Sequence, residues 1–62
     1  MSVDQEELAI LREVARLAGE WGVAFAEFQV APTPERRKKA AKLAREMSEA
    51  LGVYARFKAE RN

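Results

Sequence analysis

The sequence has no cysteine and no histidine. It therefore cannot form a disulfide, use a thiol or an imidazole in catalysis, or build a typical zinc site. Its three glycines stand singly within helical pattern rather than in a phosphate-binding loop. Its few hydroxyl side chains have no base at a spacing typical of an activated nucleophile. We expect a protein that is not an enzyme and that has no metal, cofactor or small-molecule substrate.

Long apolar runs are also missing. No window approaches 18 uncharged apolar residues, and Met1 to Glu7 is polar and acidic rather than a basic lead into an apolar stretch. This pattern predicts neither a membrane span nor a signal peptide, and we expect a cytoplasmic protein.

The chain of 62 residues is short enough to form one domain, residues 1–62. A domain of this size buries only about 60% of the surface that its unfolded chain exposes. Small domains are usually supported by disulfides, by zinc or by association with another chain. Because the first two are excluded here, self-association is the support that we expect.

Capping signals divide the chain into two helical segments. Ser2 with Gln5, and Asp4 with Glu7, have the spacing of a capping box, which places a helix start near Val3. The next boundary falls at Gln29 to Thr33.

The second start has a strong local signature. Thr33 can act as N-cap, Pro34 fits the first helical position, and Glu35 supplies an acid in the first turn. We therefore predict an all-α fold with helices at about 3–29 and 34–60 and a loop at about 30–33. A loop this short is typical of an antiparallel helical hairpin.

Apolar residues in both segments follow a helical period. Wound at about 100° per residue, the first segment forms a stripe around Val14 and the second forms one around Met47. Each stripe has small residues along one edge, and the first also has Glu6, Glu13, Glu20 and Glu27 along the other. The predicted core and dimer interface consists of Val14, Leu17, Trp21, Phe25, Phe28, Leu43, Met47, Leu51 and Tyr54.

These apolar arcs are wider than the roughly 100° that a helix needs for one neighbour. A hairpin supplies only one neighbour per helix, so we expect the second from another chain. Two hairpins would then form a homodimeric antiparallel four-helix bundle with coiled-coil packing. The alternative is a monomeric hairpin with a large exposed apolar face.

Gly22 and Gly52 each precede a valine and could end a helix. The apolar stripe keeps its phase across both glycines, which predicts that both helices continue. The alternative is that the second helix ends at Leu51 and a short third helix follows.

The net charge of +1 conceals two unlike halves. Residues 1–31 hold six acids and two bases, a net −4, whereas residues 32–62 hold nine bases and four acids, a net +5. Four consecutive bases, residues 36–39, fall in the first turns of the second helix, where the helix dipole disfavours positive charge.

We expect these bases to divide between two roles. Arg36, Arg37 and Lys39 should be offset by the acidic end of the first helix, which lies alongside in an antiparallel hairpin. The outward-facing bases should contact an acidic partner; they are Lys38, Lys42 and Arg45.

The sequence thus favours a small binding or assembly module, a regulator whose partners are a second copy of itself and an acidic partner. That acidic partner is a nucleic acid such as RNA or DNA, or an acidic protein. The inferred design resembles small hairpin-dimer bundles that present an RNA-binding face, a likeness of architecture that implies no site residues. Two alternatives remain: an adaptor or inhibitor acting through the bundle surface, and a designed bundle without natural function.

Overall fold

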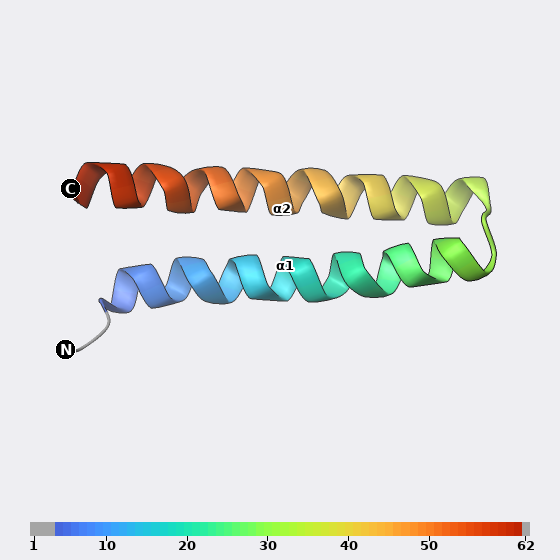
Figure 1. Ribbon diagram of the computed structural model, residues 1–62, viewed down its shortest axis with the longest axis horizontal. Coiled ribbons are helices and arrows are strands. Elements are labelled where there is room, and N and C mark those ends of the chain that lie inside the picture. The colour runs from blue at the N-terminus through green and yellow to red at the C-terminus, as the bar shows by residue number, and fades with distance from the viewer. Residues whose placement is uncertain (1–3, 62) are drawn as a thin grey trace.

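Two long α-helices joined by a short loop make up the part of the chain that the structure, a computed structural model, describes, residues 4–61. Helix α1 spans Gln5–Val30 and helix α2 spans Pro34–Arg61. They lie side by side and antiparallel, so Gln5 and Arg61 lie at the same end of the molecule (Figure 1). The predicted all-α hairpin is confirmed, and the helix ends fall within two residues of the predicted ones.

Asp4 caps α1. Its backbone is extended and its side chain accepts a hydrogen bond of 2.8 Å from the backbone N–H of Glu6. The Glu7 carboxylate, three residues further on, accepts a hydrogen bond from Tyr54 of α2. The other candidate cap, Ser2, lies outside the described residues.

The start of α2 follows the predicted cap. The Thr33 hydroxyl accepts a bond of 3.2 Å from the backbone N–H of Arg36, and the Thr33 carbonyl accepts one of 3.0 Å from the N–H of Arg37. Pro34 occupies the first helical position, where its missing N–H costs nothing. These local bonds fix where α1 ends and α2 begins.

The helices meet along a narrow seam. Leu17 and Ala24 of α1 pack with Ala40 and Leu43 of α2, and all four are at most 9% exposed. Partly buried Trp21, Met47 and Ala50 extend the contact on both helices. Buried positions alternate by three and four residues, which is the repeat of a coiled coil.

The glycines do not interrupt either helix. Both α1 and α2 are continuous through Gly22 and Gly52, and no described glycine has a positive φ. The predicted continuity is confirmed, and the alternative of a short third helix is wrong. Each glycine still costs about 1 kcal/mol of helix stability relative to alanine.

The structure sorts the predicted core residues into three groups. Leu17 and Leu43 are buried. Phe25 and Leu51 are 41% and 48% exposed and lie outside the seam of a single hairpin. The remainder are partly buried; they are Val14, Trp21, Phe28, Met47 and Tyr54.

Ala24, which is missing from the predicted core, is the most buried residue of the four, at 2% exposure. A winding of 100° per residue turns Ala24 about 80° away from Val14. The 3.5-residue repeat of a coiled coil reduces this angle to about 50° and moves Phe25 outward. The misplacement therefore comes from using the straight-helix period over ten residues.

The hairpin is long and thin. Its principal extents are 45 × 19 × 11 Å and its radius of gyration is 14.3 Å. A compact domain of this length would have a radius of gyration of about 10.6 Å. Two helices side by side form a single layer, so every residue outside the seam faces solvent in one copy of the chain.

The tight seam leads to a first prediction. Ala24→Leu adds three carbons where the helices touch and should destabilise the fold by about 1 to 3 kcal/mol. For a chain of this size that corresponds to a melting temperature lower by about 4 to 20 °C, measured by circular dichroism at one fixed protein concentration.

Ala26→Leu is the matched control, because Ala26 is exposed on the same helix. It should change stability by no more than about 0.5 kcal/mol. Equal effects of the two substitutions would show that Ala24 does not lie in a tight contact.

Candidate interaction surfaces

The two broad sides of the hairpin differ in chemistry. On one side, Phe25 of α1 and Ala44 of α2 line the same hollow, together with Ala41. Residues seven apart lie on the same side of a helix in such a pair. The apolar face therefore comprises Leu11, Ala15, Ala18, Gly22 and Phe25 of α1 with Ala41, Ala44, Ser48, Leu51 and Ala55 of α2.

The apolar face is large and carries few charges. Leu11, Phe25 and Leu51 are 37%, 41% and 48% exposed, although they are among the largest apolar side chains in the chain. A methyl group added at Gly22 would meet no atom within 4 Å. Within the part of one copy that the structure describes, residues 4–61, no segment covers this face.

The opposite side is mixed, with a row of charged side chains and three exposed valines, Val23, Val30 and Val53. The glutamates at spacing seven, Glu6, Glu13, Glu20 and Glu27, run along it on α1, and Lys39 of α2 lies 4.0 Å from Glu27. Arg16 pairs with Glu13 at 2.6 Å and also with Glu20. The hydrogen bond from Arg16 lowers the pKa of the Glu13 carboxyl. This edge is a salt-bridged surface, as its regular spacing indicates.

Lys38, Lys42 and Arg45 form an outer ridge on α2. All three are exposed, and among residues 4–61 no carboxylate lies within 4.0 Å of any of them. Glu46 and Glu49, at spacing four from Lys42 and Arg45, do not form ion pairs with them. The structure thus brings the three predicted binding residues together on one edge of α2.

The neighbouring bases have different surroundings. Arg36 donates a hydrogen bond of 3.0 Å to the carbonyl oxygen of Ala31, at the negative end of α1. Lys39 approaches Glu27, as described above. For these two, the predicted offset by the first helix is seen in the structure.

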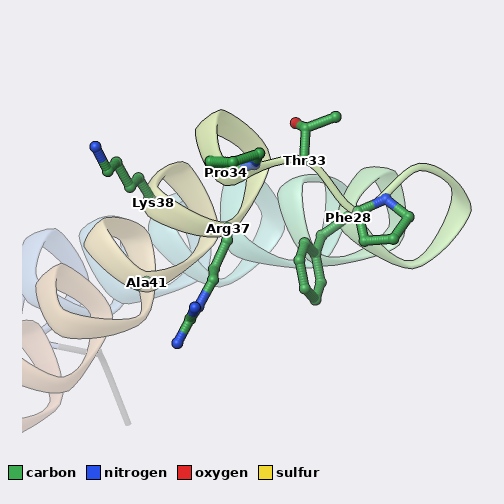
Figure 2. Close-up of a pocket in the computed structure, with 7 residues that line it drawn as sticks. Phe28, Thr33, Pro34, Arg37, Lys38 and Ala41 are labelled. Atoms are coloured by element: carbon green, nitrogen blue, oxygen red, sulfur yellow. The ribbon is translucent and has the colours of Figure 1, made fainter.

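Arg37 differs from the sequence prediction. It has no carboxylate within 4.0 Å among the described residues and instead lines two adjoining hollows of the apolar face. The larger, about 430 Å³, is also lined by Phe28, Pro32 and Pro34. Figure 2 shows Arg37 and Phe28 extending to the same side while Lys38 points away from them.

A polar network at the open end of the hairpin was not predicted from the sequence. The Tyr54 hydroxyl donates a hydrogen bond of 2.9 Å to Glu7, and the Lys58 ammonium lies 3.4 Å from the same oxygen. The Arg61 guanidinium lies 2.9 Å from Asp4 and 3.1 Å from Glu6.

These bonds join residues about fifty positions apart in the sequence and tie the helix ends together. The guanidinium of Arg61 also stacks 4.6 Å from the ring centre of Phe57. Nothing in the local sequence around Glu7 or Tyr54 signals the pairing, which depends on the register of the two helices.

The network shifts two pKa values. The hydrogen bond from the backbone N–H of Glu6, aided by Arg61, lowers the pKa of Asp4. The hydrogen bond to Glu7 raises the pKa of the Tyr54 hydroxyl. The stability that the ionised Asp4 carboxylate contributes is therefore lost as the pH falls through the pKa that Asp4 has in the folded chain. The stability that the neutral Tyr54 hydroxyl contributes is lost as the pH rises through the folded-state pKa of Tyr54.

Within residues 4–61 the structure contains no cluster of three or more acidic side chains placed to hold a metal ion. In the same residues no helix is long and apolar enough to cross a membrane.

Comparison with known proteins gives no relative. No protein-family model matches the chain, and no curated protein or solved structure matches it significantly.

The Tyr54 contact leads to a second prediction. Tyr54 is the only tyrosine, so its ionisation can be followed directly by ultraviolet absorbance. We expect it to ionise at a pH above that of a model tyrosine, because Glu7 stabilises the neutral hydroxyl. Glu7→Gln should lower the pKa of Tyr54 toward its ordinary value of about 10.

Glu13→Gln is the control, since it removes an equal charge from an ion pair that does not include Tyr54. It should leave the tyrosine titration unchanged. A titration midpoint that responds equally to both variants would mean that net charge rather than the hydrogen bond sets the pKa of Tyr54.

Proposed function

We propose that the chain is a small non-enzymatic binding and assembly module. Two hairpins form a homodimeric four-helix bundle, and the outer ridge of each hairpin binds an acidic partner. That partner is a nucleic acid such as RNA or DNA, or an acidic protein. The observation that carries the proposal is the set of three exposed cations with no carboxylate within 4.0 Å among residues 4–61. Nearby, Lys39 pairs with Glu27 and Arg36 donates a hydrogen bond to the Ala31 carbonyl.

The position of the ridge makes this arrangement costly to the isolated chain. Lys38 lies in the second turn of α2, near the positive end of the helix dipole. The dipole effect falls off beyond the first turn, so the cost of the ridge comes mainly from the repulsion among its three cations. A negatively charged partner would offset the repulsion among the three side chains, and long basic side chains can reach it without a change in the backbone.

The assembly part of the proposal is supported by the shape of the hairpin. One layer of two helices leaves the apolar face uncovered, and only four described side chains are buried. Isolated two-helix layers of this length have little core to offset their loss of conformational entropy. A second apolar layer would supply the missing contacts.

A second candidate function rests on the same apolar face. An adaptor or inhibitor could use it to receive an apolar helix of another protein, as helix-in-groove partners do. Such binding would depend little on salt, whereas phosphate contacts weaken steeply as salt rises. A designed bundle without natural function would show neither kind of partner.

A third prediction tests the outer ridge. Changing Lys38, Lys42 and Arg45 together to Gln should leave the melting temperature within a few degrees of the wild type. The probe is a short double-stranded RNA titrated at several salt concentrations. The variant should lose most of its affinity at low salt, and the slope of log affinity against log salt should fall in magnitude by up to about 3 per chain.

The matched control changes Arg36, Arg37 and Lys39 to Gln, which removes the same charge from the same helix. This variant should melt at a lower temperature, because the contacts to Ala31 and Glu27 are lost. It should retain more of the salt-dependent binding than the ridge variant.

Polyglutamate is the second probe and stands for an acidic protein. Binding of polyglutamate without RNA would identify the partner as protein. Wild-type affinity and salt slope in the ridge variant, with both probes, would show that the outer ridge is only a solvated surface.

A further inference from the structure

We infer that the apolar face is covered by a second copy of the chain, packed face to face with the two loops at opposite ends of the dimer. This inference rests on the proposed homodimer and specifies its interface and its direction.

The exposed area is larger than a monomer of this mass should have. The hairpin exposes 4873 Å², whereas a compact monomeric protein of 7.0 kDa exposes about 4,000 Å². The excess, about 800 Å² per chain, equals the area that each partner contributes to a standard stable interface. The opposite side also exposes apolar side chains, Val23, Val30 and Val53, but there they are interspersed with the row of glutamates. The ten residues of the apolar face include no charged side chain, so this face is the better suited to burial against a second copy.

The middle of the apolar face permits close approach. Ala15, Ala18 and Gly22 lie around the mid-length of α1, and Ala44 and Ser48 lie near the mid-length of α2. On α1, no side chain larger than alanine therefore stands at mid-length on this face, whereas on α2 Leu51 lies as far from the mid-length as Ala44 does. A flat centre made of small residues lets two helix backbones approach closely, and it requires a partner that is equally flat there.

On α1 the large residues Leu11 and Phe25 stand toward the two ends of the face, and they match when the loops are opposed. A two-fold axis across the middle of the hairpin sets α1 over α1 of the second copy. Each residue of α1 then lies at the same height along the helix axis as the α1 residue of the other copy whose number adds with its own to about 35. Phe25 therefore faces Leu11 of the other copy. For α2 the two numbers add to about 95, so Leu51 faces the small Ala44 of the other copy.

The hollow at the loop end is filled by the same arrangement. It is lined by Phe28, Pro32 and Arg37 and has a volume of about 430 Å³ (Figure 2). Leu8 of the second copy lies at the level of Phe28, and its side chain is of a size to enter this apolar space. Loops at the same end would instead place Phe25 at the level of Arg37 of the other copy.

Charge favours the same direction. The loop-end half, residues 18–47, holds six bases and four acids, a net +2. The open-end half, residues 4–17 and 48–61, holds five bases and six acids, a net −1. Loops at opposite ends place each positive half beside a negative one, whereas loops at the same end add two positive halves together.

The first test is sedimentation equilibrium of the full chain at micromolar concentration. The wild type should have about twice the mass of the 7.0 kDa chain. Ala18→Glu places an unpaired charge at the centre of the interface and should weaken association by about a hundredfold or more. Ala26→Glu, on the same helix outside the apolar face, should leave the dimer intact.

The second test uses the absence of native cysteine. Ala18→Cys places a thiol within about one residue of the two-fold axis, so oxidised glutathione should convert it to a symmetric disulfide between two copies. Ala44→Cys is the control: with opposed loops its two copies lie about 10 Å apart along the helix axis, beyond disulfide reach. Non-reducing electrophoresis reads the result, and it remains informative if Ala18→Glu fails to fold.

Each outcome has a distinct meaning. A folded wild-type monomer whose melting temperature is independent of concentration would overturn both this inference and the proposed homodimer. A dimer that survives Ala18→Glu would overturn the assigned face and leave the homodimer standing. Crosslinking between Ala18→Cys and Ala44→Cys chains, without self-crosslinking of Ala18→Cys, would overturn the direction. RNA binding by the outer ridge is measured separately and does not affect these results.

Discussion

The contact between Leu17 and Ala24 of α1 and Ala40 and Leu43 of α2 is the constraint on which the rest of the structure depends. It fixes the register of two helices that have no disulfide between them. That register sets Tyr54 beside Glu7 and Lys39 beside Glu27. It also decides which side chains remain outside, and so separates the apolar face from the side that carries the glutamates.

Local signals in the sequence were sufficient to predict the elements. The Asp4 and Thr33 caps, Pro34 and the unbroken apolar phase across Gly22 and Gly52 all act over a few residues, and the structure agrees with each. The seam required more precision than the pattern offered. Because the pair follows a 3.5-residue repeat, a straight-helix winding misplaced Ala24 and set Phe25 too close to the centre.

The candidate surfaces were predictable where charge alone defines them. Lys38, Lys42 and Arg45 face outward in any register of the hairpin, so the sequence identified the ridge. The register of the two helices decides two further features, the Tyr54–Glu7 hydrogen bond and the position of Arg37 beside Phe28. No local sequence pattern encodes that register. For the same reason, Arg37 was assigned an acidic neighbour that the structure does not place near it.

The closeness of Asp4 to Arg61 at the open end has a consequence for the connectivity of the fold. The stabilising contacts of the seam run between the helices and do not involve the loop at residues 31–33. A circularly permuted chain, with a short linker joining the ends of α2 and α1 and a break in that loop, could form the same pair in the reverse order. The present order of the helices is then one of two that are compatible with this packing, and the Thr33 cap is the local feature that the permuted order would lose.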